Sequence, residues 1–169
     1  ILSRLEKYGV KIDSNNPKVQ KILDEVKDRE FSGYTYDGAD ASFELLANRL
    51  LGKLPEYLKV KSYNVSVSKS DKILTKANVV FLIDGKEISC DGEGNGPVNA
   101  LDNAIRSNFK KVEKYYNFFA DLKLLDYKVR ILNTGTEATT RVLIESTDKT
   151  GISWFTVGVS PNIIEASFK

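Results

Sequence analysis

A repeat with an offset of 64 residues is the feature that most constrains how this 169-residue chain can fold. Similar residues recur at this offset without a gap, and the pairs include Tyr63 and Tyr127, Val65 and Val129, Val67 and Ile131, Thr75 and Thr139, Gly94 and Gly158, and Pro97 and Pro161. Agreement in both side-chain type and turn residues indicates one supersecondary unit used twice. Because a unit of this size buries too little apolar surface to be stable alone, we expect both copies to contribute to one structure.

Each copy has the pattern of three strands followed by a helix. Strands are predicted, mainly from the alternation of apolar and polar residues, at 63–67, 77–83, 87–90, 127–131, 138–144 and 152–157. Asp84-Gly85 is typical of a tight hairpin turn. Helices are predicted over 97–114 and from Pro161 onward. The predicted fold class is therefore α+β, with two βββα units related by a pseudo-two-fold axis.

The residues before the repeat are predicted to be helical. Apolar positions spaced by three and four residues indicate helices at 1–9, from Pro17, and over 39–51. The predicted organisation is a helical linker subdomain at 1–55 and one domain at 56–169, the latter containing the βββα units 57–114 and 121–169.

The glycine-rich stretch Glu93-Gly94-Asn95-Gly96-Pro97 connects the last strand of the first unit to its helix. Its glycines permit a tight turn, including a positive φ, and Pro97 suits the first position of a helix. The free N–H groups there, together with the positive end of the helix dipole, favour an anion. A phosphate, a carboxylate or an acidic side chain of the protein would each satisfy them.

The repeat predicts a second turn of this kind at 158–161. If both helix N-termini face one region, that region suits the carboxylate of an amino acid. Asp126 would then bind the ammonium group, and Val98 and Ile131 would contact an aliphatic side chain. The alternative, in which these glycines and prolines only shape turns and helix ends, stays open.

The composition excludes several classes of site. The chain contains no histidine, so it can form neither a Ser-His-Asp triad nor a histidine-ligated metal site. Its single cysteine, Cys90, has no second thiol for a disulfide and no histidine to activate it. Because the sequence shows no signal peptide and no membrane-length apolar run, we expect a cytoplasmic protein without a membrane partner. The chain also lacks methionine, even at its start, so we expect it to be part of a longer protein.

Nucleic acid is not an expected partner. The net charge is only +2, and both signs are mixed along the chain. The order of elements over 39–114 is that of a double-stranded-RNA-binding domain, but those domains need lysines at the start of their second helix. Residues 97–103 contain no lysine and one aspartate. A phosphate loop is also disfavoured, because Gly94-x-Gly96 lacks the following Lys-Ser/Thr pair.

Several segments together resemble the C-terminal regulatory domain of the 2-isopropylmalate and (R)-citramalate synthases. These segments are 94–101, 126–131, 135–138 and 156–167. The stretch 31–46, which begins Phe31-Ser32-Gly33-Tyr34, is similar to the citramalate synthase branch in particular. The resemblance covers nearly the whole chain in the right order.

The resemblance implies a function as well as a fold. Enzymes of this family condense acetyl-CoA with a 2-oxo acid, pyruvate in citramalate synthase, on a TIM-barrel domain that holds a divalent metal. That barrel is not expected in this sequence, so neither catalysis nor a cofactor is expected here. The family's C-terminal domain forms a homodimer, binds the end-product amino acid at the dimer interface and inhibits the enzyme. Isoleucine is favoured over leucine as the effector.

Matching positions carry over an effector site that comprises Gly94, Asn95, Gly96, Val98, Asn99, Leu124, Tyr127, Ile131 and Ala138. Two alternatives stay open. One is the leucine-sensing domain of a 2-isopropylmalate synthase, and the other is a structural dimerisation module that binds no effector.

Overall fold

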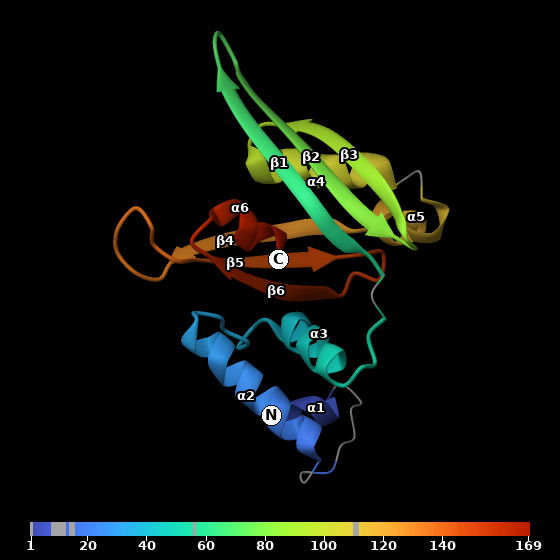
Figure 1. Ribbon diagram of the computed structural model, residues 1–169, viewed down its shortest axis with the longest axis vertical. Coiled ribbons are helices and arrows are strands. Elements are labelled where there is room, and N and C mark those ends of the chain that lie inside the picture. Colours follow the sequence, from blue (N-terminus) through green and yellow to red (C-terminus); the bar gives the residue numbers. More distant parts are fainter. Residues whose placement is uncertain (1, 8–12, 14–15, 56, 110–111) are drawn as a thin grey trace. The chain divides into compact units, whose positions relative to one another are not determined.

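Two compact units make up the structure, a computed structural model that describes residues 2–7, 13, 16–55, 57–109 and 112–169 (Figure 1). One unit combines Ile1–Pro55 with Lys123–Lys169, and the other is the continuous segment Glu56–Leu122. Each repeat contributes a three-stranded antiparallel sheet followed by a helix, which confirms the α+β class and the two βββα units. The predicted pseudo-two-fold axis and the predicted domain boundaries stay predictions.

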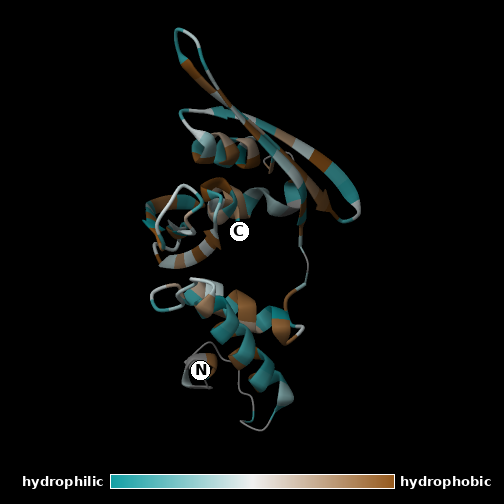
Figure 2. Ribbon diagram, turned by 60° about the vertical axis from the view of Figure 1, so that its left-hand side comes forward, coloured by the Kyte–Doolittle hydropathy of each residue, from teal (hydrophilic) through white to brown (hydrophobic). Residues whose placement is uncertain are grey.

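The unit Glu56–Leu122 is built on a sheet of three strands, which are β1 (Lys59–Lys69), β2 (Ile73–Ile83) and β3 (Lys86–Gly94). β2 lies in the middle and pairs antiparallel with both neighbours. Asp84 and Gly85, with φ of 48° and 77°, form the two-residue turn that their sequence predicts. Figure 2 shows hydrophobic and hydrophilic segments alternating along these strands.

Helix α4 (Pro97–Phe109) covers one face of this sheet. Every second residue of β2 is buried on that face, and the buried row is Thr75, Ala77, Val79, Phe81 and Ile83. Phe81 packs edge-to-face on Phe109, with 5.1 Å between the ring centroids. The other face carries polar pairs such as Lys76 with Glu93, which is the pattern of an antiparallel sheet with one solvated side.

The prediction of one continuous helix over 97–114 is wrong at its C-terminal end. α4 ends at Phe109, and a separate helix, α5 (Glu113–Ala120), follows. The ring centroid of Phe119 in α5 lies 4.5 Å from that of Phe109, so α5 packs against the end of α4. The hydroxyl of Tyr115 donates a hydrogen bond to the carbonyl oxygen of Tyr57, 3.1 Å away, and fixes α5 to the start of the unit.

The other unit contains the second sheet, which is formed by β4 (Lys123–Ile131), β5 (Thr140–Thr147) and β6 (Ser153–Ser160). Both faces of β6 are covered. Gly158 lies against Ala166 of α6 (Ile163–Phe168) on one face. Its neighbours Val157 and Val159 point the opposite way and pack with Ala39, which directly precedes α3 (Asp40–Leu50). Figure 1 shows α3 beside β6. The helix predicted over 39–51 is thus confirmed as α3.

Two hydrogen bonds tie the helical segment to this second sheet. The N–H of Val157 donates to Ser42 Oγ at 2.9 Å, and Arg141 Nε donates to the carbonyl oxygen of Gly33 at 2.5 Å. Helices α1 (Leu2–Lys7), α2 (Pro17–Phe31) and α3 share a core that includes Tyr36. The predicted end of the first helix, at residues 8–9, lies outside the described residues.

The strand register shows that the offset of the repeat is not constant. β1 and β4 are related by 64 residues, because each has a bulge at the equivalent place, after Val60 and after Leu124. Downstream, the pairing relates β2 to β5 by 65 residues and β3 to β6 by 66. In the first sheet, Val67 pairs with Thr75, and Thr75 pairs with Gly94. In the second sheet, Ile131 pairs with Thr140, and Thr140 pairs with Ser160.

Three of the predicted correspondences are therefore wrong. Thr75 corresponds to Thr140, Gly92 corresponds to Gly158, and Pro97 corresponds to Ile163. The second βββα unit has one more residue in each of its two strand connections. Each extra residue increases the offset between corresponding positions by one and leaves the order of elements unchanged. An alignment without gaps follows the element order correctly but misplaces the residues after each connection.

Candidate functional site

The turn between β3 and α4 carries five of the predicted site residues. The carbonyl of Gly96 accepts the first helical hydrogen bond, from the N–H of Ala100 at 2.9 Å. Asn99 Oδ1 accepts a hydrogen bond from the N–H of Asn95 at 3.1 Å. The side-chain oxygen of Asn99 therefore closes the turn from within the helix. Asn95 is exposed and Val98 is half-buried beside it.

Close packing requires glycine at this turn. A Cβ on Gly94 would lie 2.5 Å from Asn99 Oδ1 and 2.6 Å from the backbone nitrogen of Ala100, whereas Gly96 has open space around it. Neither glycine has a φ in the left-handed region. The predicted positive φ is therefore wrong, because the end of the strand approaches the start of the helix too closely for any side chain.

A buried hydroxyl lies at the base of the same turn. Thr75 pairs with Gly94 across β2 and β3, and its side chain is fully buried. Within the described part of the chain, its Oγ1 has no hydrogen-bond partner. A buried, unsatisfied polar group costs about 1–3 kcal/mol, so a polar partner for Thr75 would stabilise this unit.

In the second predicted turn, a side chain of the protein accepts hydrogen bonds from the N–H groups at the start of α6. Asn162 Oδ1 accepts hydrogen bonds from the N–H groups of Ile164 at 2.9 Å and Glu165 at 3.2 Å, which is the geometry of an N-cap. Glu165 Oε2 accepts from Ser160 Oγ at 2.9 Å, and this bond, together with Lys169, lowers the pKa of Glu165. The donors that were expected to bind an external anion are occupied here by the protein's own side chains.

A β-bulge in β4 brings predicted site residues onto one face. In a regular strand Leu124 and Tyr127 would point to opposite faces, because their spacing is odd. The pairing shifts between Leu124 and Asp126, so Leu124 shares the face of Tyr127, Val129 and Ile131. These four residues are called the β4 row below.

Strand β1 of the other unit has the same arrangement. A bulge between Val60 and Ser62 places four apolar residues of β1 on the face toward α4. These four residues, called the β1 row below, are Val60, Tyr63, Val65 and Val67. Each row is partly uncovered, with Val67 58% and Ile131 67% exposed. Helices α4 and α6 contact mainly the second and third strands of their sheets, so the first strand keeps an open apolar face.

The remaining predicted residues have different surroundings. Tyr127 Oη and Ser167 Oγ lie 2.6 Å apart, which joins the β4 row to α6. Ala138 is buried in the connection before β5. Asp126 lies on the face opposite Tyr127 and pairs with Lys128 at 2.7 Å. That hydrogen bond lowers the pKa of Asp126, so the carboxylate expected to bind an ammonium group is already engaged.

The nine predicted site residues are thus divided between the two units. Five of them, between Gly94 and Asn99, form one turn. Leu124, Tyr127 and Ile131 share one strand face, and Ala138 lies in the connection before β5. Among the described residues, no group of three or more His, Cys, Asp or Glu could hold a metal ion. None of the helices in the described segments has the length and apolar character of a membrane span.

The two βββα units lie within the match to a known protein family. The family model of the LeuA allosteric (dimerisation) domain matches residues 37–169, which include α3, both sheets and the helices that follow them. The chain belongs to this family of allosteric dimerisation domains.

Its relatives narrow the class further. The chain is 45% identical over 174 residues to an (R)-citramalate synthase of Geobacter sulfurreducens, covering 100% of the chain and 32% of the relative. It is 42% identical over 173 residues to an (R)-citramalate synthase of Aquifex aeolicus, with 99% and 32% covered. A 2-isopropylmalate synthase of Clostridium acetobutylicum is 36% identical over 127 residues, which cover 73% of the chain and 20% of the relative. The resemblance to the citramalate synthase branch is thus confirmed, and the chain spans about a third of the length of the two citramalate synthases.

Proposed function

We propose that the chain is the regulatory and dimerisation region of a citramalate synthase, a cytoplasmic acyltransferase that condenses acetyl-CoA with pyruvate. In this proposal the condensation and its divalent metal belong to a catalytic domain outside the present sequence. The allosteric domain family supports the regulatory role. The citramalate synthase relatives, of which the chain spans about a third, support the existence of a further domain.

The proposed effector is a branched-chain amino acid, with isoleucine favoured, that inhibits the enzyme as its end product. The β4 row carries this proposal, because its bulge places Leu124, Tyr127 and Ile131 on one face. That face offers an aliphatic side chain an apolar wall with a single hydroxyl. The start of α4 would supply N–H groups for the carboxylate, as helix N-termini do. The nine residues remain a joint prediction for the effector site.

The proposed assembly is a homodimer without a nucleic acid or membrane partner. The β1 and β4 rows expose apolar side chains that a second copy would cover, and exposed apolar patches mark interaction sites in folded proteins. An effector at an interface between copies would regulate the enzyme by binding one arrangement of the dimer more tightly than another.

Calorimetric titration of the chain with isoleucine, leucine and valine tests the effector. We expect saturable heat with isoleucine and weaker binding of the other two. Ile131→Ala should weaken isoleucine binding by about tenfold or more, a loss of about 1.4 kcal/mol. Ile152→Ala is the matched control, since Ile152 is an isoleucine of similar exposure outside the β4 row. The absence of heat with all three amino acids at millimolar concentration would refute effector binding.

A structural dimerisation module without an effector is the second candidate. The turns themselves favour it, because Asn162 and Asn99 already use their oxygens to satisfy backbone N–H groups. This candidate predicts a dimer in light scattering and no ligand-dependent rise in melting temperature. A leucine-sensing 2-isopropylmalate synthase domain would instead bind leucine more tightly than isoleucine.

A further inference from the structure

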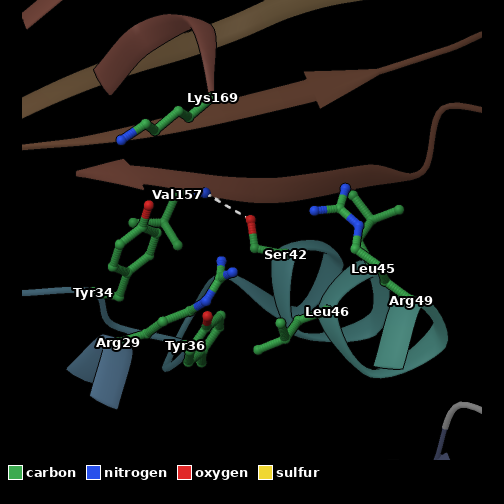
Figure 3. A pocket seen from close by; sticks show the side chains of 9 residues that line it. All are labelled: Arg29, Tyr34, Tyr36, Ser42, Leu45, Leu46, Arg49, Val157 and Lys169. Atoms are coloured by element: carbon green, nitrogen blue, oxygen red, sulfur yellow. Dashed lines mark hydrogen bonds between the residues drawn. The ribbon is translucent and has the colours of Figure 1, made fainter. Parts of the chain in front are cut away.

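A cavity on the helical side of the second sheet contains none of the nine predicted effector residues. Its volume is about 330 Å³, at the lower end of the range of about 300–1,000 Å³ for small-molecule sites. Side chains of α2, α3, β6 and the segment between the two helices surround it, together with Lys169, which follows α6 (Figure 3). All of these elements belong to one unit.

The lining of this cavity is basic. Arg29, Arg49 and Lys169 line it, and none of its described lining residues is acidic. Glu25 accepts a hydrogen bond from Arg29 Nε at 2.6 Å, and Lys169 pairs with Glu165 at 3.1 Å. Arg49 has no ion-pair partner among the residues that the structure describes. The cavity therefore has a net positive charge.

Arg29 is held in place by its surroundings. Its Nε is bound by Glu25, and its Cζ lies 5.6 Å from the centroid of the Tyr34 ring, within the range of a cation–π interaction. Figure 3 shows its two terminal nitrogens directed toward Ser42 rather than toward the backbone of α2. A guanidinium fixed in this way loses little conformational entropy when it binds a further acceptor.

Neutral donors and an apolar wall complete the cavity. Ser42 Oγ accepts a hydrogen bond from the N–H of Val157 (dashed in Figure 3), so the hydroxyl proton of Ser42 remains available for another acceptor. Tyr36 also lines the cavity, and burial raises the pKa of its hydroxyl above the ordinary value. Leu45 and Val157 supply apolar surface beside these groups.

We propose that this cavity binds a small oxyanion, a phosphate or carboxylate group, through the guanidinium groups of Arg29 and Arg49 with the hydroxyl of Ser42 as a third donor. The planar fork of arginine matches both anions in a bidentate manner. Because Ser42 and Val157 already join α3 to β6, a bound anion would also strengthen the attachment of the helices to the second sheet.

Calorimetric titration of the chain with inorganic phosphate and with succinate, in low-salt buffer, tests this site. We expect saturable binding of at least one anion, and the stronger of the two identifies the phosphate or the carboxylate class. Arg49→Gln should weaken that binding by about tenfold or more, and Arg49→Lys should restore part of it. Arg49 is exposed, so neither change is expected to unfold the protein.

Lys21→Gln is the matched control, because it removes the same charge from an exposed position on α2 that does not line the cavity. Its affinity for the anion should equal that of the wild type. The proposal would be overturned if Lys21→Gln and Arg49→Gln lost the same affinity for the anion. It would also be overturned if neither anion showed saturable binding at millimolar concentration. The result is independent of the proposed effector, since the titration contains no branched-chain amino acid.

Discussion

Gly158 lies so close to Ala166 that no Cβ fits between them. Gly92 has the same relationship to Ala100 and Ala104 in the other unit. The third strand of each sheet therefore meets its helix through a contact between glycine and alanine. This contact, and not turn flexibility, explains why glycine occurs at corresponding places in both repeats.

Replacing Gly158 by alanine should destabilise the protein by about 1–3 kcal/mol, the usual cost of adding a methyl group to a well-packed site. The new methyl group would meet the backbone of Ala166, which has little room to move. Gly96→Ala is the matched control, because open space surrounds Gly96. Urea unfolding followed by circular dichroism compares the two, and equal midpoints would show that the contact at Gly158 relaxes freely.

Asn162→Ala should cost about 1 kcal/mol, because it removes the side chain that caps α6. Asn162→Gly should cost only a few tenths of a kcal/mol, since glycine is itself a tolerated N-cap residue. Hydrogen exchange of the Ile164 and Glu165 amides reports the cap directly. If both variants leave those amides as protected as in the wild type, the cap does not hold the helix.

The pKa of Glu165 should lie below its ordinary value of 4.5, chiefly because the Ser160 hydroxyl donates to its carboxylate, with Lys169 as the second cause. A folded-state pKa below the unfolded one means that ionised Glu165 stabilises the fold at neutral pH. This stabilisation is lost as the pH falls through the folded-state pKa. NMR titration should show a larger rise in this pKa for Ser160→Ala than for Lys169→Ala, and the reverse order would contradict the assignment.

Charges placed in the apolar rows should weaken dimerisation. Val67→Lys in β1 and Ile131→Lys in β4 would each require a second copy to bury an ammonium group, which is unfavourable. Leu74→Lys is the matched control, because Leu74 is exposed on the opposite face of the first sheet. Light scattering over a concentration series should show more monomer for the two row variants than for Leu74→Lys. The same dissociation constant in all three variants would exclude the rows from the interface.

The order of elements could be predicted from the sequence because the spacing of apolar residues and the residue types at turns depend only on neighbouring positions in the chain. Apolar alternation identifies β2, and Asp84-Gly85 identifies its turn, without knowledge of any distant contact. The break between α4 and α5 could not be predicted in this way. It depends on Phe109 packing against Phe119, a contact that the helical period does not encode.

The sequence supplied candidate residues for the site, which remain predictions, but it did not supply their geometry. Alternation alone places Leu124 and Tyr127 on opposite faces, and a bulge, which carries no distinct sequence signal here, puts them together. From its position in the sequence, Asp126 was predicted to bind an ammonium group. In the structure it lies on the opposite face of β4 and forms an ion pair with Lys128. The sequence did contain one indication that the second sheet is covered on both sides. Leu143, Val157 and Val159 are apolar residues on the face that packs against the helical segment.

The unit built on the second sheet has its two parts at opposite ends of the chain, with the continuous unit Glu56–Leu122 between them. During synthesis on the ribosome, the middle unit would therefore emerge complete while Ala39 and Ser42 still lacked the strand that covers them. β6, whose Val157 N–H donates a hydrogen bond to Ser42, is made only after the middle unit. The helices that precede the middle unit would thus complete their packing only after that unit has been made.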